Sequence, residues 1–343
     1  MEKKKITIVD VAKKLGVSTS TVSRALQDHP TISQNTKKLV RKTVAELNYS
    51  PNSVAASLRK GKVNSIGVII PKINSTFMSN CIYGIESVTY PAGYNLIICQ
   101  SNENFEKEVH NIRTLIDSQV SGIMLSLSNE TIDTEHLKNV INKDIPLVMF
   151  DRVDESLGVD CVVNDDIEIS KEVIVHLANQ GYKKIAIISG PSHIYVYKNR
   201  LAGYINGLSQ LNLEKSDEWI VKGIQTTQEA FEATNKLFQN SNTPDAIFCT
   251  SDTIALGAIQ AVEKMGLKIP NDIGVVGYSN DIFSEIIKPS LTSVEQFPKD
   301  IGANAARIML DLLKQEDTLQ QVRKMVFIKP SLIIHKSSVR NSK

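Results

Sequence analysis

Residues 7–26 read TIVDVAKKLGVSTSTVSRAL, and this stretch decides the fold of the N-terminal part of the chain. Thr7 and Asp10 have the spacing of a capping box, which predicts that a helix begins here. Gly16 permits a tight left-handed turn, because glycine has no Cβ. Ser18 can cap a second helix. These signals predict two short helices joined by a tight turn.

A third helix is expected after Ser33, which is a suitable N-cap, and it ends by Tyr49 and Ser50 because Pro51 disfavours a helical residue before it. Three short helices around a glycine turn are typical of a helix-turn-helix domain. The alternative is a three-helix bundle that binds other proteins. The predicted buried residues are Ile8, Val11, Ala12, Leu15, Val22, Ala25, Leu26, Leu39, Val40, Val44 and Leu47.

The charge of the chain is divided unevenly. Residues 1–62 hold ten Lys and three Arg against two Glu and two Asp, a net charge of +9. Because the whole chain carries +2, the remaining residues carry −7. A basic head on an acidic body suggests that a polyanion binds the head. A solvated lysine-rich terminus is the alternative.

The second predicted helix has the side chains of a DNA-reading helix. Arg24 can donate two hydrogen bonds to guanine O6 and N7, the commonest specific base contact. Thr21 and Ser23 suit phosphate oxygens, while Thr19 and Ser20 at the tip suit base edges. The predicted DNA contacts of the head are Thr7, Ser18, Thr19, Ser20, Thr21, Ser23 and Arg24.

Residues 51–61, PNSVAASLRKG, have the pattern of a short helix that Asn52 caps and Gly61 ends. So short a helix is unstable alone in water. We expect it to order against DNA and a second subunit, with Asn52, Ala55 and Leu58 as DNA contacts. A flexible tether is the alternative.

After residue 62, short apolar runs alternate with amphipathic segments, which is typical of parallel, doubly wound α/β sheets. We expect two Rossmann-like lobes of about six strands each, with ligands bound at the carboxyl ends of the strands. The predicted strands are residues 65–70, 94–100, 122–127, 145–150, 184–189, 245–250 and 273–278.

Polar residues follow five of these strands, and together they favour a cleft that binds a polyhydroxylated small molecule. Each cluster alone is weak evidence, because Asp and Asn are also common in caps and turns. The clusters are residues 71–77 (PKINSTF), 151–152 (DR), 189–191 (SGP) leading toward 199–204 (NRLAGY), 251–252 (SD) and 279–281 (SND).

Several functions are disfavoured. The chain has no apolar run of the roughly 18–20 residues that a membrane helix needs, and its start does not read as a signal peptide. The four cysteines form no CxxC pair, and no GxGxxG, GxxxxGK[ST] or GxSxG motif occurs. We therefore expect a cytoplasmic, nucleoid-associated protein without a cofactor, a metal or catalytic residues.

The chain resembles the lactose-repressor (LacI) family of bacterial transcription regulators over nearly its whole length. The motifs that carry the resemblance are TIVDVA (7–12), GVS (16–18), TVSRAL (21–26), YSPN (49–52), SLR (57–59), IGVIIP (66–71), DR (151–152), RLAGY (200–204), ALGA (255–258) and PSLT (289–292).

The resemblance implies a regulator, most simply a repressor, that binds a palindromic operator as a homodimer and responds to a sugar or sugar acid. In such proteins a leucine of the linker helix wedges into the minor groove, a role that corresponds to Leu58. An activator, or a regulator that needs a corepressor, remains the alternative. The effector residues that the resemblance implies are Asn74, Phe77, Asp151, Arg200 and Ser251. Of these, we expect Asp151 and Arg200 to orient the effector from opposite lobes.

The resemblance also implies domain boundaries. We expect a DNA-binding domain over residues 1–50, a hinge over 51–62, an effector domain over 63–336 and a tail over 337–343. The N-lobe would comprise residues 63–163 and 292–324, and the C-lobe 164–291 and 325–336. The expected crossings between lobes are residues 162–165, 288–293 and 323–327.

Two features depart from the family pattern. Ser279 and Asn280 stand where an acidic pair is common, so we expect them in the effector site and weakly favour an acidic sugar. The C-terminal residues have no leucine heptad, so we expect a dimer rather than a coiled-coil tetramer.

Overall fold

The computed structural model describes residues 6–49, 64–239, 241–314 and 323–340. The chain divides into two compact units, Met1–Val63 and Asn64–Lys343. The hinge residues Asn52, Ala55 and Leu58 lie outside the described residues. None of the described helices is long and apolar enough to span a membrane.

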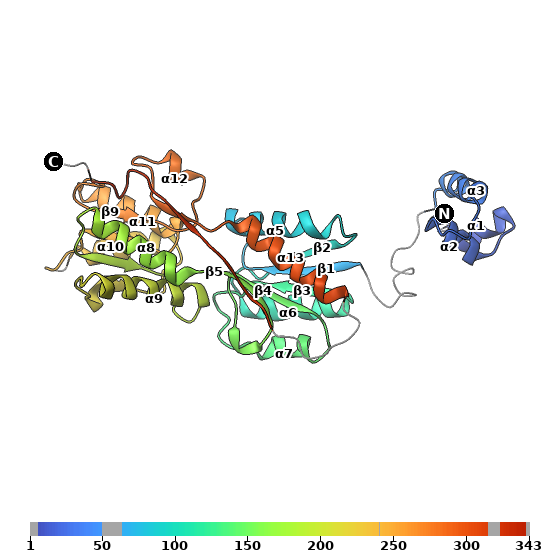
Figure 1. Ribbon diagram of the computed structural model, residues 1–343, viewed down its shortest axis with the longest axis horizontal. Helices are drawn as coiled ribbons and strands as arrows, with labels where there is room; N and C mark the ends of the chain where they lie inside the picture. The colour runs from blue at the N-terminus through green and yellow to red at the C-terminus, as the bar shows by residue number, and fades with distance from the viewer. Residues whose placement is uncertain (1–5, 50–63, 240, 315–322, 341–343) are drawn as a thin grey trace, which may run out of the picture. The chain divides into compact units, whose positions relative to one another are not determined.

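The first unit contains three helices, α1 (Ile8–Leu15), α2 (Thr19–Leu26) and α3 (Gln34–Glu46), as predicted (Figure 1). The Asp10 carboxylate accepts hydrogen bonds from the backbone N–H and the hydroxyl of Thr7, and Gly16 has a φ of 64°. Ser18 and Ser33 cap α2 and α3. One prediction was wrong: Leu39 is 54% exposed, because it lies on the outer face of α3.

The first lobe of the second unit is a parallel six-stranded sheet in the order β11-β5-β4-β3-β1-β2. One face packs against α5 (Thr76–Thr89) and α13 (Pro298–Lys314), and the other against α6 (Phe105–Asp117) and α7 (Glu135–Ile141) (Figure 1). The strands are β1 (Ser65–Ile70), β2 (Asn95–Gln100), β3 (Gly122–Leu125), β4 (Leu147–Phe150), β5 (Asp160–Asn164) and β11 (Met325–Ile328).

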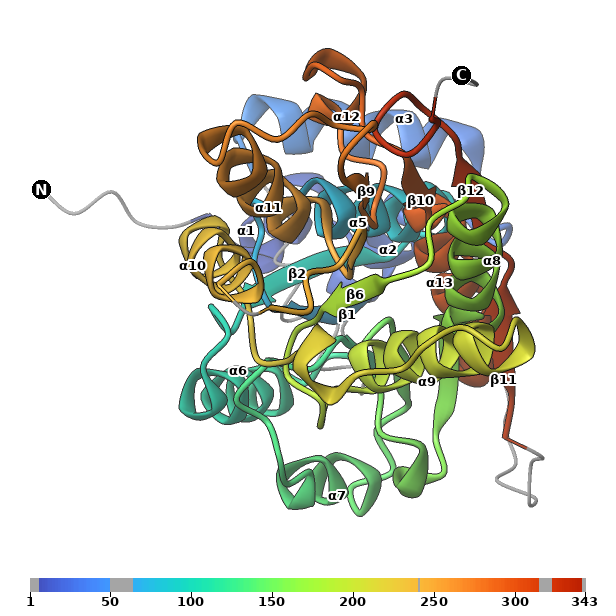
Figure 2. The ribbon, with the colours of Figure 1, turned by 90° about the vertical axis from the view of Figure 1, so that its left-hand side faces the viewer.

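The second lobe has a four-stranded parallel sheet in the order β7-β6-β8-β9, fewer than the six strands predicted. Helices α10 (Thr227–Leu237) and α11 (Asp252–Lys264) cover one face, and α8 (Asp166–Asn179) and α9 (Tyr195–Gln210) cover the other (Figure 2). The strands are β6 (Ile185–Ile188), β7 (Ile220–Val221), β8 (Ala246–Cys249) and β9 (Gly274–Val276). The short helix α12 (Phe283–Ile286) follows β9.

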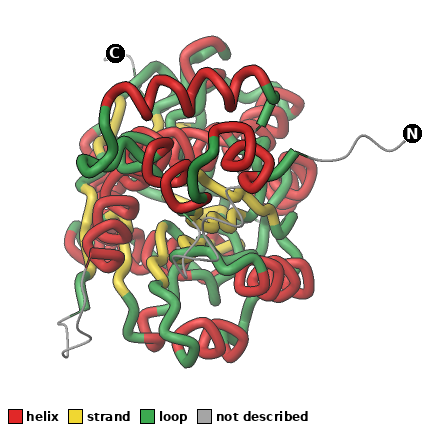
Figure 3. Tube along the Cα trace, turned by 90° about the vertical axis from the view of Figure 1, so that its right-hand side faces the viewer, coloured by secondary structure: helices red, strands yellow, loops and turns green. Residues whose placement is uncertain are grey.

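In both lobes, helices lie outside the strands, as the tube view shows (Figure 3). A separate antiparallel pair joins β10 (Ser293–Glu295) to β12 (Ser331–Ile333). Val294 and Leu332 of this pair pack into the apolar core of the second lobe. The six strands of the second lobe are therefore divided between a parallel sheet of four and this antiparallel pair, rather than forming the single six-stranded set that was predicted.

The predicted crossings between lobes need two corrections. Thr292 pairs with Val276 of β9, and β10 also belongs to the second lobe, so the chain changes lobe after β10 rather than within residues 288–293. β11 pairs with β5 in the first lobe, so the last crossing follows Ile328 rather than lying within residues 323–327. Residues 292–295 and 325–328 thus each lie in the lobe opposite to the one expected.

Part of the predicted C-terminal tail packs into the second lobe. Ser337 is fully buried, its hydroxyl donates to Val275 O over 2.6 Å, and it accepts from the Thr292 backbone N–H over 2.8 Å. Ser338 is also buried and bonds to Thr292 Oγ1. Residues 337 and 338 are therefore part of the second lobe.

Two glycines allow α5 and α13 to cross closely. A Cβ on Gly84 would lie 2.1 Å from Lys299 O, and a Cβ on Gly302 would lie 2.0 Å from Cys81 O. Both obstacles are backbone atoms, which cannot move aside without shifting a helix. The two helices cover one whole face of the first sheet, so this crossing fixes how that face is packed.

We predict that Gly302→Ala lowers the free energy of unfolding of the effector unit by about 1–3 kcal/mol, the usual cost of overpacking. Arg307→Ala, on the exposed side of the same helix, is the control and should change it by less than about 0.5 kcal/mol. Urea unfolding of the full chain, followed by circular dichroism, measures both. Equal stabilities of the two variants would show that the crossing tolerates a methyl group.

Candidate functional site

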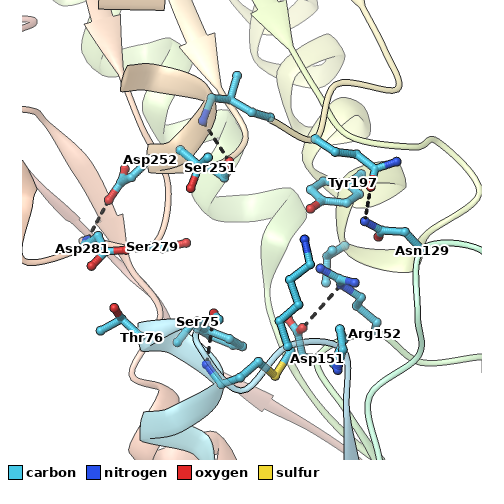
Figure 4. Close-up of a pocket in the computed structure, with 18 of the residues that line it drawn as sticks. Ser75, Thr76, Asn129, Asp151, Arg152, Tyr197, Ser251, Asp252, Ser279 and Asp281 are labelled. Carbon is cyan, nitrogen blue, oxygen red and sulfur yellow. Dashed lines mark hydrogen bonds and ion pairs between the residues drawn. The ribbon is translucent and has the colours of Figure 1, made fainter. Parts of the chain in front are cut away.

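A cavity of about 310 Å³ opens between the two lobes of the second unit. The first lobe contributes the loop after β1, the start of α5 and the residues after β4. The second lobe contributes the first turns of α9 and α11 and the loop after β9. Figure 4 shows Ser75 and Thr76 from the first lobe facing Ser251 and Asp252 from the second. The cavity thus lies at the carboxyl ends of both sheets, where α/β proteins bind ligands.

Six of the seven effector residues expected from the sequence line this cavity: Asn74, Phe77, Asp151, Arg200, Ser251 and Ser279. Asn280 does not line it, because its Nδ2 donates to Glu295 Oε2 over 3.0 Å and holds the side chain in an adjoining cavity. Asp281, the next residue, lines the main cavity instead. An acidic residue is therefore present after this strand, displaced from the expected position rather than lost.

Asp151 is a buried carboxylate with few partners. It follows β4 with a φ of 60° and is 7% exposed. Ser126 Oγ lies 3.4 Å from its Oδ2, and Arg152 Nε lies 3.9 Å from the same atom. Burial raises the pKa of Asp151 to about 6, although Arg152 and Arg200 oppose the shift. A hydroxyl or N–H donor on a ligand would relieve this unfavourable burial.

Arg200 is held by its own lobe. Its Nε donates to Asp166 Oδ1 over 3.0 Å, its Nη1 donates to Thr250 O over 2.9 Å, and its guanidinium lies 3.7 Å from the ring centre of Tyr278. The hydroxyl of Tyr278 donates to the same Asp166 oxygen. Arg200 lines the cavity. It also stabilises the second lobe, because it balances the charge of the buried Asp166 carboxylate. Removing it would leave Asp166 buried without its counter-charge.

Arg152 is similarly committed. Its Nη1 donates to Glu103 Oε2 over 2.8 Å, and the same carboxylate oxygen accepts from the Asn129 backbone N–H over 2.8 Å. All three residues line the cavity. The guanidinium charge that faces a ligand here is therefore already paired.

Two further cavity residues, the predicted Ser251 and its neighbour Asp252, also have structural roles. Ser251 caps α11 by accepting from the Ile254 N–H over 3.2 Å. Asp252 accepts from Ser293 Oγ, Ser284 Oγ and the Asp281 N–H, so its charge is well satisfied (Figure 4). Ser251 therefore has a role that requires no ligand.

Among the cavity residues that were not predicted are four with polar side chains: Glu103, Asn129, Tyr197 and Gln225. Glu103, Asn129 and Gln225 lie in the loops that follow β2, β3 and β7, so the rule that ligands bind at strand ends could have found Glu103 and Asn129. Strand β7 has only two residues and was not predicted, which hid Gln225. Tyr197 lies in the first turn of α9, between the predicted polar clusters 189–191 and 199–204.

The helix-turn-helix unit places the predicted DNA contacts on and before α2. Arg24 is exposed, while Val22 and Ala25 on the opposite face are buried. The hydroxyl of Ser18 is hydrogen bonded to that of Ser20 over 2.7 Å and to that of Thr21 over 2.8 Å. The remaining predicted residues, Thr7, Thr19 and Ser23, are exposed or half-buried.

Two family models match the chain. One, described as periplasmic binding proteins and sugar binding domain of LacI family, matches residues 63–331. The other, described as bacterial regulatory proteins, lacI family, matches residues 7–52. The chain belongs to the LacI family. This confirms the predicted family, the α/β fold with a helix-turn-helix head, and a transcriptional regulator rather than an enzyme.

Similar proteins support this membership. The chain is 33% identical over 330 residues to the transcriptional repressor PurR of Vibrio campbellii, covering 96% of this chain and 97% of PurR. It is 33% identical over 312 residues to catabolite control protein A of Priestia megaterium, covering 91% and 93%. A structure of the lac repressor dimer bound to operator and the anti-inducer ONPF has a TM-score of 0.88 at 25% identity, covering 98% of this chain and 100% of that one.

The raised pKa of Asp151 gives a pH prediction for this LacI-family protein. The folded protein binds the Asp151 proton more tightly than the unfolded chain does, so ionisation destabilises the fold as pH rises from about 4 to about 6. Asp151→Asn should therefore stabilise the effector unit at pH 7, by up to about 3 kcal/mol.

Thermal unfolding of wild type and Asp151→Asn from about pH 3 to about pH 7 measures this difference. The two melting temperatures should converge as the pH falls below about 4, where the carboxyl group of the wild type becomes protonated in the unfolded chain as well as in the folded protein. A difference that does not change with pH would contradict a raised pKa.

Proposed function

We propose that the protein is a repressor that binds a palindromic operator as a homodimer in the cytoplasm, at the nucleoid, and that a small molecule in the interlobe cavity controls this binding. The observation that carries the proposal is the cavity itself, in which an under-partnered buried carboxylate faces polar side chains of a second lobe. The relatives named PurR and the operator-bound lac repressor dimer support the DNA-binding part. An activator or a corepressor-dependent regulator would use the same parts.

We propose further that the effector is a neutral polyhydroxylated molecule rather than a sugar acid. Lining carboxylates from Glu103, Asp151, Asp252 and Asp281 outnumber the lining cations Lys72, Arg152 and Arg200. Both arginines are paired with carboxylates, and Lys72 is exposed. The carboxylate of a sugar acid would therefore be repelled by the Asp151 carboxylate, and neither lining arginine is unpaired and able to offset that repulsion. The aromatic rings of Phe77 and Tyr197, which also line the cavity, suit the apolar face of a sugar ring.

For DNA, Arg24→Ala should weaken binding to the best duplex selected from a random pool by about 5- to 150-fold and relax preference at one base pair per half-site. Arg41→Ala is a control of equal charge, because Arg41 on α3 is paired with Asp28 over 2.5 Å. Fluorescence anisotropy at several salt concentrations separates lost charge from lost base reading. Equal losses for both variants, with unchanged base preference, would contradict a base-reading role for Arg24.

For the effector, melting temperatures of the full chain should rise more with D-ribose, D-glucose or cellobiose than with D-gluconate or D-glucuronate. At equal ligand concentration, a ligand with a lower Kd stabilises the folded protein more, so the comparison ranks the ligands. A sugar that binds should also change the affinity for the selected duplex. Stronger stabilisation by the acids, abolished by Lys72→Ala, would overturn the neutral assignment.

A further inference from the structure

Asn129, in the loop after β3, contacts the opposite lobe through both its side chain and its backbone. Its Nδ2 donates to Gln225 Oε1 over 2.9 Å, and its carbonyl oxygen lies 2.7 Å from His193 Nε2. Gln225 follows β7 and His193 precedes α9, so both partners belong to the second lobe. A single residue thus joins the two walls of the cavity (Figure 4).

The loop that carries Asn129 is fixed from its own lobe. The Asn129 N–H donates to Glu103 Oε2 over 2.8 Å, and the Ser128 N–H donates to Glu108 Oε2 over 2.7 Å. Glu108 is fully buried and also accepts from Thr131 Oγ1 over 2.9 Å. Because these bonds are made to the backbone around Asn129, the loop stays folded when the side-chain contact to Gln225 is lost, but it then has one hydrogen bond fewer to break when it opens locally.

One polar atom of this residue lacks a partner. Asn129 is 7% exposed, lines the cavity, and its Oδ1 is buried with no hydrogen bond to any residue that the structure describes. A buried acceptor without a donor costs about 1–3 kcal/mol, so such atoms in a binding cavity point to a ligand. Together with the contact to Gln225, this atom distinguishes Asn129 from the other residues that line the cavity.

We propose that Asn129 is a positioning and specificity-determining residue: its amide holds the lobes together through Gln225, and its Oδ1 accepts a hydrogen bond from a donor on the effector. The second half of this inference rests on the proposed function of the cavity. A ligand that bonds to Oδ1 engages the residue that already spans the lobes. It therefore favours the joined arrangement over a separated one, which is the differential affinity that a ligand needs to shift a conformational equilibrium.

The contact between lobes is tested on the full chain without any ligand, by hydrogen–deuterium exchange. Gln225→Ala, in the second lobe, should speed exchange about 2- to 10-fold in peptides covering residues 126–131 of the first lobe, the effect of losing one hydrogen bond. Gln228→Ala is the matched control, because Gln228 bonds only to Glu232 among the described residues. Equal exchange in both variants would overturn the joining role of Asn129.

The ligand contact is tested by calorimetry with D-ribose, D-glucose and cellobiose. Asn129→Ala removes both the lobe contact and the acceptor, whereas Gln225→Ala removes the lobe contact alone. We expect Asn129→Ala to weaken binding of the responding sugar about five- to tenfold more than Gln225→Ala does. Equal weakening would overturn the Oδ1 contact. If none of the three sugars binds the wild type, the proposed neutral-sugar effector fails, while the exchange comparison still decides the lobe contact.

Discussion

The two-lobed unit depends on a pair of buried amide side chains at the place where the chain passes between the lobes. Asn164 Nδ2 donates to Gln296 O over 3.0 Å and to Ile328 O over 3.1 Å, and Gln296 Nε2 donates back to Asn164 Oδ1 over 3.1 Å. These three residues end the segments in which the chain leaves one lobe for the other. The pair of amides therefore ties all three crossings together. Since Gln296 also lines the cavity, a ligand there lies directly against the crossings.

Around these crossings between the lobes, the buried ion pairs join residues of the same lobe rather than residues of different lobes. Arg200 is paired with Asp166 in the second lobe, and Arg152 with Glu103 in the first. Breaking such a buried pair is costly, so these charges stabilise each lobe by itself. Between the lobes the structure instead has neutral contacts, of which Asn129 with Gln225 is one. Strong bonds within lobes and weaker bonds between them are consistent with the proposed control by a small ligand.

In this arrangement, the buried arginines stabilise their own lobes and are not free to bind a ligand. The Asp151 carboxylate is the exception, because it is buried at some cost and has only distant partners. Functional sites commonly retain such unfavourable groups, which a ligand then satisfies. Glu103, Asn129, Tyr197 and Gln225, which were missed from the sequence, have roles that come from their neighbours rather than from a motif.

The sequence by itself determined the helix-turn-helix head, because capping boxes, a glycine turn and helical spacing are local signals that Thr7, Gly16 and Ser18 carry within a few residues. It also determined the alternation of strands and helices, and the polar strand ends that place Asp151 and Ser279 at the cavity. Only the tertiary structure decided which lobe residues 292–295 and 325–328 join, because strand pairing between distant segments leaves no local pattern. The same is true of the partners of Arg200 and Asn129. A side chain's type can be read from the sequence, but whether it is free or already paired depends on residues that only folding brings near.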